Sequence, residues 1–494
     1  MKTVFLNRKL FYLIILTALS FLYLFINIHY PINSDSISTL IISKDILHGN
    51  ILLHGWELSA QSFYLTEILP YALLFGAAGW HLSFYYLVPA LMWSIVIMLT
   101  ATLSGKNILW GWPFLALLAV PSFWAVPLIL SPCYHVGGYI LMLLFWVIIN
   151  KYPKLIQFDF SLKNAAIWSL ISIFTALFMA SDDLIKYCLT LPLIAACVLK
   201  TITSNKLTHP ALALSMLCAL GLEHAVKNAL THNGAFHVPG LWSSSFASKD
   251  RAAYNASVLL SGALNFFDAD FLGKPISLLG TGRQIVHAVL AAVTLLFFCK
   301  SAINYKKWNI FQITSGLSFC IMIFAFIFSE ITIDEKSFRY LIFPYLIILI
   351  TSIQTTNLNF YSKILISFIG IVSIFLSYPK IDTLDYAKAN NNYAINRYLA
   401  SKNLSKGFGL YWIAAANSVP NVIRIAPVEF SQKRLKAAHT LTKPEWYADG
   451  GRFVLCNTEE EALKLEKAYG PADVTKIDNV FVTIWDHNIT IPNE

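Results

Sequence analysis

Residues 10–36 read LFYLIILTALSFLYLFINIHYPINSDS, a predominantly apolar run that ends in a polar segment with a single carboxylate, Asp35. About 20 apolar residues in helical conformation are enough to cross the hydrocarbon core of a bilayer. The preceding residues 1–9 are basic, and no small-residue cleavage site follows the apolar run, as a removable signal peptide would require. The sequence therefore predicts an uncleaved signal anchor, with Asp35 a few residues beyond its outer end.

Apolar runs of similar length recur along the chain. Of the 494 residues, 57% are hydrophobic and 13% are charged, whereas soluble globular proteins are about 25% charged. This composition favours a polytopic α-helical membrane protein. The eleven expected transmembrane helices are residues 10–29, 83–103, 108–129, 135–150, 164–180, 184–200, 210–226, 284–300, 309–329, 341–356 and 362–378. A further run, residues 63–80, contains Glu67 and Pro70, and we expect it to lie along the outer interface.

The position of charge gives the expected topology. The chain has 36 basic and 27 acidic residues, a formal net charge of +9. With the N-terminus inside, lysines such as Lys106, Lys151, Lys200 and Lys300 face the cytoplasm, accompanied by a single acid, Asp159. This obeys the positive-inside rule, and eleven spans then place the C-terminal tail outside. Because the cations lie between apolar runs and not on one polar face, nucleic acid is not an expected partner.

The sequence changes character after residue 380, which predicts two domains. Residues 1–380 form the membrane domain, with outer segments at 30–82 and 227–283, and residues 381–494 form a C-terminal extracytoplasmic α/β domain. Its boundary is expected in the Asn-rich stretch at 390–392. A helix is expected to begin at Asn457, a good N-cap with Glu460 three residues later. Strand-like runs occur at residues 407–414, 422–428, 452–456 and 480–485.

Asp35 is the first candidate for a catalytic group. A sugar or alcohol hydroxyl is a poor nucleophile at neutral pH, and a fixed carboxylate within hydrogen-bond reach can accept its proton during the reaction. The alternative is that Asp35 caps the helix that follows, within the Ser34-Asp35-Ser36 cluster.

Further acids lie on the predicted outer side. Asp182 and Asp183 interrupt two apolar runs, and paired carboxylates can hold a divalent cation or bind acceptor hydroxyls. A tight turn between helices is the alternative, because Asp is favoured there. Glu67 lies inside an apolar helix and either faces the same cavity or extends to the interface.

Four basic residues are candidates for binding an anionic phosphate. Arg339 stands next to Tyr340 at the start of a late span, where a planar guanidinium can form two hydrogen bonds to phosphate. An interfacial Arg/Tyr anchor would explain the same position. Lys336, Lys186 and Arg283 could add positive charge to the same cavity.

Together these features resemble the GT-C superfamily of integral-membrane glycosyltransferases. The resemblance rests on the N-terminal span, the long outer loop that opens with Asp35, the interfacial helix that ends in Leu74-Phe75-Gly76, and an outer soluble tail. Asp182 and Asp183 resemble the acid of a later short outer loop, and Arg339-Tyr340 resembles the basic residue that holds the donor phosphate. The tail segment 409–412 (Gly-Leu-Tyr-Trp) and Trp446-Tyr447 are similar to bacterial members that modify O-antigen or other surface glycans. Where the family often has an acidic pair, this chain has Asp35-Ser36.

The resemblance implies an inverting glycosyltransferase, a hexosyltransferase, in the bacterial cytoplasmic (inner) membrane. It would take a polyprenyl-phosphate-linked sugar as donor, with a glycan or lipid-linked acceptor such as lipopolysaccharide on the periplasmic side. No cofactor is certain, and a divalent cation is possible. Two other classes remain open: a transporter or flippase for a lipid-linked saccharide, and a membrane acyl- or phosphoethanolamine-type transferase. Walker A, GxSxG and HExxH motifs are absent from the sequence, so ATP-driven transport and serine or zinc proteolysis have no support.

Overall fold

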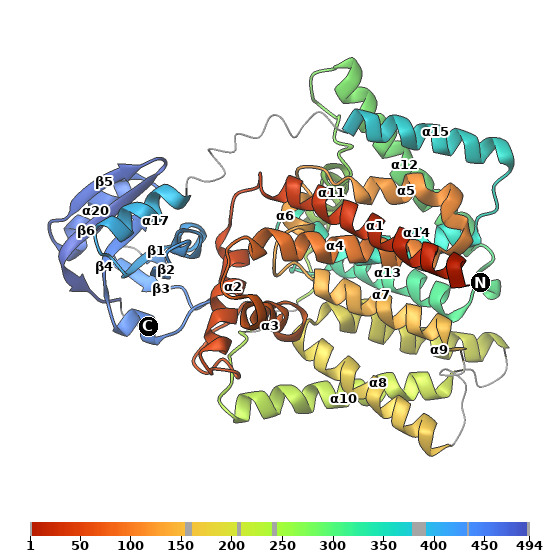
Figure 1. Cartoon of the computed structure of the whole chain (residues 1–494), viewed down its shortest axis with the longest axis horizontal. Coiled ribbons are helices and arrows are strands. Elements are labelled where there is room, and N and C mark those ends of the chain that lie inside the picture. The colour runs from red at the N-terminus through yellow and green to blue at the C-terminus, as the bar shows by residue number, and fades with distance from the viewer. Residues whose placement is uncertain are drawn as a thin grey trace. The chain divides into compact units, whose positions relative to one another are not determined.

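The computed structural model describes residues 2–153, 161–204, 209–239, 245–377, 392–431 and 434–491. The described chain is mostly helical, with one sheet in its C-terminal part (Figure 1). Contacts group it into two compact units. The first unit comprises Met1–Asn27, Pro89–Val226 and Leu241–Asp382, and the second comprises Ile28–Val88, Lys227–Gly240 and Thr383–Glu494. The predicted boundary between residues 380 and 381, and residues 390–391 of the Asn-rich stretch, lie outside the described residues.

The first unit is a helical bundle. Two of its helices continue into the second unit: residues 84–88 at the start of α4 and residues 227–232 at the end of α10 are grouped there. Its longer helices are α1 (Lys2–Asn27), α4 (Phe84–Ser104), α5 (Ile108–Ala119), α7 (Val136–Lys151), α8 (Leu162–Ser181), α9 (Leu191–Ser204), α10 (Pro210–His232), α11 (Lys249–Phe266), α12 (Leu278–Ala302), α13 (Ile310–Phe328), α14 (Ile342–Thr355) and α15 (Phe360–Ser377). The short elements are η2 (Gly105–Asn107), α6 (Val126–Ile129), η4 (Lys186–Thr190), η5 (Tyr305–Lys307) and η6 (Glu335–Leu341).

Seven helical stretches in the described chain are long and apolar enough to cross a membrane: Leu10–Asn27, Phe84–Ser104, Leu162–Ser181, Lys186–Thr203, Leu278–Ala302, Ile310–Phe328 and Glu335–Thr355. The predicted count of eleven is therefore not confirmed. The expected span 108–129 is divided, because α5 ends at Ala119 and the next helix, α6, begins only at Val126. The expected spans 135–150 and 362–378 correspond to the shorter apolar helices Val136–Lys151 and Phe360–Leu376.

Helix α14 lies at the centre of the first unit. Every residue from Ile342 to Ile353 is buried, and α14 packs against α5, α12 and α13. A run of Leu and Ile without any charge suits a helix surrounded by other helices on all sides. This central position matters for the candidate site, because Arg339 immediately precedes α14.

The second unit joins a helical segment to the C-terminal sheet region. Its helices before the sheet are α2 (Ser34–Leu47), η1 (Tyr64–Ile68) and α3 (Leu69–Ala78). The C-terminal elements are α17 (Asn392–Ser401), β1 (Lys406–Leu410), α18 (Tyr411–Ala414), η8 (Ala415–Ser418), β2 (Arg424–Ser431), β3 (Arg434–Ala437), α19 (Glu445–Ala448), β4 (Gly451–Cys456), α20 (Glu459–Tyr469), β5 (Asp473–Ile477) and β6 (Val480–Ile489). Residues 28–88, which the sequence analysis assigned to the membrane domain, are thus grouped by contacts with this sheet region.

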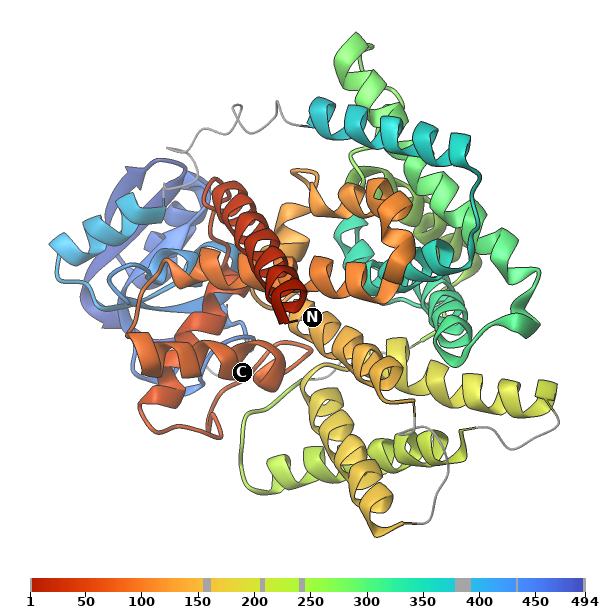
Figure 2. The ribbon, with the colours of Figure 1, turned by 45° about the vertical axis from the view of Figure 1, so that its right-hand side comes forward.

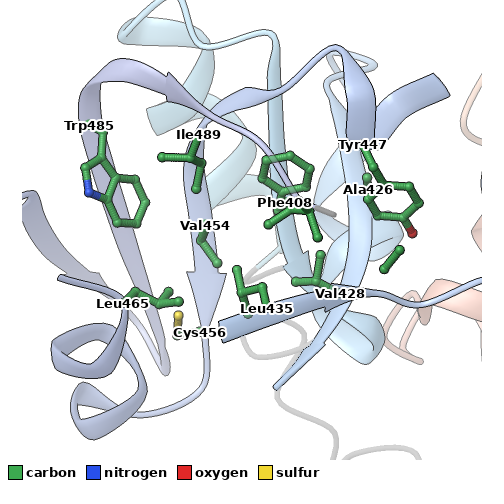
Figure 3. Close-up of a cluster of buried hydrophobic side chains, with 12 residues drawn as sticks. Phe408, Ala426, Val428, Leu435, Tyr447, Val454, Cys456, Leu465, Trp485 and Ile489 are labelled. Atoms are coloured by element: carbon green, nitrogen blue, oxygen red, sulfur yellow. The ribbon is translucent and has the colours of Figure 1, made fainter. Parts of the chain in front are cut away.

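The sheet has the strand order β3-β2-β1-β4-β6-β5. Strand β1 is parallel to both β2 and β4, while the other pairs are antiparallel. One face carries a buried core that includes Phe408, Tyr447, Val454 and Trp485 (Figure 3). The α/β character of the tail is therefore as predicted.

Three details of the tail differ from the sequence prediction. Strands β3 and β5 were not predicted, because they are short edge strands that carry charged residues, as edges commonly do. Helix α20 has Thr458 as its N-cap, in a capping box with Glu461, and not Asn457 with Glu460. The first predicted strand ends at Leu410, where the chain turns into α18 and so directs Tyr411 away from the sheet.

Candidate functional site

Asp35 lies in the first turn of α2. The N-cap of this helix is Asn33, whose side chain accepts a hydrogen bond of 2.9 Å from the Ser36 amide. The alternative interpretation, in which Asp35 is the cap, is therefore wrong. The Asp35 carboxylate accepts a hydrogen bond from the Tyr411 hydroxyl, and the positive end of the helix dipole favours a carboxylate in this turn.

Two more hydrogen bonds tie the start of α2 to the chain after β1. Ser34 Oγ donates to the Trp412 carbonyl at 2.9 Å, and the Ala416 amide donates to Ser34 Oγ at 3.2 Å. Since residues 411–416 turn sharply at the end of β1, the sheet region fixes the position of Asp35 through both its side chain and its neighbour.

A cavity of about 240 Å³ lies beside these contacts. Its walls include the aromatic side chains of Trp56, Tyr411 and Trp446, and the rings of Trp56 and Trp446 meet edge to face at 5.3 Å. Serine hydroxyls also line it, including that of Ser34. Aromatic walls with a few polar groups are typical of small-molecule pockets. Of the two tryptophans in the tail segments that resemble bacterial family members, Trp446 lines the cavity, while Trp412 is 64% exposed.

Asp45 holds one wall of this cavity in place. Its carboxylate accepts a hydrogen bond of 2.8 Å from Trp56 Nε1 and forms an ion pair with Lys443 Nζ at 3.0 Å. Burial alone would raise the pKa of Asp45, but the hydrogen bonds from Trp56, Lys443 and Asn50 outweigh it, so this pKa lies below the ordinary value. Asp45 does not stand out in the sequence, because its partners lie in the loop after α2 and in the tail.

Glu67 lies in η1, and its side chain is buried. The interpretation in which it extends to the interface is therefore wrong. It belongs to the second unit, as Asp35 does.

In the first unit, Asp182 is buried against His135. The Nδ1 atom of His135 lies 2.9 and 3.0 Å from the two carboxylate oxygens of Asp182, and their side chains are 5% and 0% exposed. An ionised carboxylate only accepts hydrogen bonds, so in this contact Nδ1 is the donor when Asp182 is ionised. The Asp182 carboxylate also accepts the Leu184 amide at 3.0 Å, which closes the turn after α8. The turn interpretation is thus confirmed, and the same carboxylate orients an imidazole.

Asp183 has a different partner from its neighbour. Lys186 Nζ lies 3.3 Å from Asp183 and 3.1 Å from Glu223 on α10. The charge of Lys186 is therefore shared between two carboxylates. Among the described residues, no group of three or more His, Cys, Asp or Glu side chains is placed to hold a metal ion.

Arg339 lies in η6, directly before α14, among tyrosines. Its guanidinium lies 4.9 Å from the ring centre of Tyr340 and 5.7 Å from that of Tyr134, and it donates a hydrogen bond of 3.0 Å to the Tyr340 hydroxyl. The Tyr139 hydroxyl donates to the Arg339 carbonyl at 2.8 Å. Because the Tyr340 ring also meets the His135 ring at 5.7 Å, the structure brings Arg339 and Asp182 into one cluster through His135 and Tyr340.

Two other predicted phosphate ligands, Arg283 and Lys336, differ in how far their charge is already engaged. Arg283 is 4% exposed and pairs with Asp268 at 2.6 Å, so its charge is already neutralised. Lys336 is exposed in the first turn of η6, where its amide is bound by the Asp334 side chain. His135 was missed by the sequence analysis, since an isolated histidine gives no sign that its partner is 47 positions away.

Gly138 offers a test of the His135–Asp182 pair. A Cβ atom at this position would lie 2.7 Å from Asp182 Oδ2, so Gly138→Ala should displace the carboxylate and cost about 1–3 kcal/mol. Gly221 on α10 is the control, because a Cβ there meets nothing within 4 Å. We expect thermal unfolding in detergent to show a lower midpoint for Gly138→Ala, and an unchanged or raised midpoint for Gly221→Ala. Equal midpoints would contradict a tight Asp182 site.

Comparison of the chain with protein-family models, with curated proteins and with solved structures found no match.

Proposed function

We propose that the protein is an inverting glycosyltransferase of the GT-C kind, which moves a sugar from a polyprenyl-phosphate donor to a hydroxyl of a glycan or lipid-linked acceptor. The observation that carries this proposal is Asp35, a carboxylate fixed by Tyr411 next to an aromatic-walled cavity. The cavity suits a sugar ring, since aromatic faces pack against its C–H surfaces while hydroxyls bind its edges.

In the proposed reaction the protein forms no covalent bond with the sugar. Polyprenyl phosphate is a good leaving group, so the chain needs to position the acceptor, accept its proton and stabilise the departing phosphate. Asp35 takes the role of general base: the acceptor oxygen bonds to the anomeric carbon as its proton passes to the carboxylate, and the bond to the phosphate oxygen breaks.

Arg339 takes the role of phosphate ligand. Stacking against Tyr134 and Tyr340 restricts the guanidinium, so less conformational entropy is lost when it binds an anion. His135, oriented by Asp182, belongs to the same cluster.

The proposed location is the bacterial inner membrane, with the N-terminus in the cytoplasm and the C-terminal part in the periplasm. The support is the distribution of lysines between the apolar helices.

The function is tested with purified protein in liposomes that contain a polyprenyl-phosphate hexose and an oligosaccharide acceptor. The expected result is an acceptor heavier by one hexose, together with released polyprenyl phosphate. Movement of the lipid-linked saccharide across the bilayer without any mass change would support a transporter instead. Addition of an acyl or phosphoethanolamine mass from membrane lipid would support the third class.

Arg339→Gln should weaken donor use. We expect KM for the polyprenyl-phosphate donor to rise by about 10–100-fold, the effect of losing a charged hydrogen-bond partner of about 1.5–3 kcal/mol. Arg339→Lys keeps the charge but not the planar pair of donors, so an intermediate value is expected. The Tyr139 bond to the Arg339 carbonyl is retained in both variants. An unchanged KM in Arg339→Gln would exclude the phosphate role.

A further inference from the structure

Helices α5 and α15 of the first unit enclose an apolar groove. Figures 1 and 2 show α15 alongside α5 and α12, and the contacts agree. The two helices approach closely at Gly370, where a Cβ atom would lie only 2.4 Å from Pro113 Cβ. Mostly on the N-terminal side of this contact, a groove of about 560 Å³ opens between them. Its walls are formed by Asn107, Leu109, Trp110, Phe360, Lys363, Ile364, Ser367, Phe368 and Ile371.

The groove presents apolar side chains that the protein leaves uncovered. Leu109 is 83% exposed, Phe360 71% and Phe368 62%. Only Trp110, at 5%, is buried, so it forms part of the floor. In a helix pair that lies within a bilayer, hydrocarbon covers such a surface. Exposing it to water would cost a free energy of roughly 25 cal/mol per Å² of apolar area.

One wall of the groove carries a cation. Lys363 is half-buried, and in the part of the chain that the structure describes no hydrogen bond or ion pair engages its ammonium group. Lys363 lies in the first turn of α15, where the helix dipole adds positive potential. The neighbouring amide of Asn107 is already used, since it donates to the Ile353 carbonyl at 2.9 Å. The two parts of an anionic lipid match this arrangement: the acyl chain suits the apolar walls, and the anionic headgroup suits the Lys363 ammonium near the end of the groove.

We propose that this groove binds an anionic phospholipid, with the phosphate at Lys363 and one acyl chain over Trp110, between Ile364 and Phe368. The two ends of the groove differ, because Gly370 packs against Pro113 near one end while Lys363 lies near the other. This inference is independent of the proposed transferase function, since none of these residues belongs to the candidate site.

The probe is phosphatidylglycerol, compared with phosphatidylcholine of the same acyl chains, and its retention by the full-length protein is measured by native mass spectrometry. We expect phosphatidylglycerol to be preferred by about fivefold, the contribution of one lysine near an anionic lipid. Lys363→Gln should remove the preference and Lys363→Arg should keep it. Ser367→Trp fills the middle of the groove and should lower the retention of both lipids.

Lys300→Gln is the matched control, because this exposed lysine in the last turn of α12 lies outside the groove. It removes the same charge and should leave the preference unchanged. The unfolding midpoint of each variant is measured alongside. A midpoint equal to that of the wild type shows that the variant is folded and that its loss of lipid binding has another cause. Equal retention of the two lipids by the wild type, equal losses in Lys363→Gln and Lys300→Gln, or stronger retention of polyprenyl phosphate than of phosphatidylglycerol would each overturn the proposal.

Discussion

Asp35→Asn is expected to reduce sugar transfer by about 10²–10⁴-fold, the usual contribution of a general base. The amide has nearly the same shape and can still accept the hydrogen bond from Tyr411, so the packing of α2 should be retained. Because the loss lies in the chemical step, kcat should fall while KM for donor and acceptor changes little. The measurement is initial rates of hexose transfer in the liposome assay.

Tyr411→Phe is the matched variant for this experiment. It removes the hydroxyl that contacts Asp35 but leaves the carboxylate, and Ser34 still bonds to the Trp412 carbonyl. We expect a loss of roughly tenfold or less, since one positioning hydrogen bond contributes about 1 kcal/mol. Full activity of Asp35→Asn in a folded, inserted protein would rule out the base assignment and leave Asp35 a structural role.

Asp182→Ala is expected to destabilise the first unit by about 1–3 kcal/mol for each buried donor that it leaves without an acceptor. Three hydrogen-bond contacts disappear: two from His135 Nδ1 and one from the Leu184 amide. The imidazole, which is almost completely enclosed, would lose the acceptor that sets its tautomer. Thermal unfolding in detergent micelles, followed by circular dichroism, measures the change.

Asp183→Ala provides the comparison at the adjacent position. Its side chain is 23% exposed, and its partner Lys186 keeps a second carboxylate, Glu223. A partly exposed ion pair contributes about 0–1 kcal/mol, so this variant should melt close to the wild type. Asp182→Asn can still accept from Nδ1 and should fall between the two. If Asp182→Ala and Asp183→Ala had the same unfolding midpoint, the buried His135–Asp182 pair would not be the stabilising element.

Several parts of the fold could be predicted from local sequence. Seven of the expected spans correspond to helices of membrane-spanning length, because hydropathy over about 20 residues is a local property. Strands β1, β2, β4 and β6 and the following helix α20 were recognised by the same kind of local pattern. The expected span 108–129 shows the limit: the run is continuous in hydropathy, but its helical structure is interrupted between Ala119 and Val126.

The candidate residues show the same limit. Asp35, Asp182 and Arg339 stood out because each places a charge beside an apolar run, but their roles depended on partners that no local pattern contains. Arg283 was proposed for phosphate, yet Asp268 pairs with it. The neighbours Asp182 and Asp183 looked equivalent, and the structure gives one to a histidine and the other to a lysine.

The sequence alone determined that this chain is rich in membrane-length helices and that its tail is an α/β region, because helical hydrogen bonds and hydropathy depend on residues close together in the sequence. The tertiary structure decided which charges meet. Asp35 is 376 positions from Tyr411, and Asp182 is 47 positions from His135. Pairs so far apart in sequence form only when packing selects which elements become neighbours, and many arrangements of the same helices satisfy the same hydropathy.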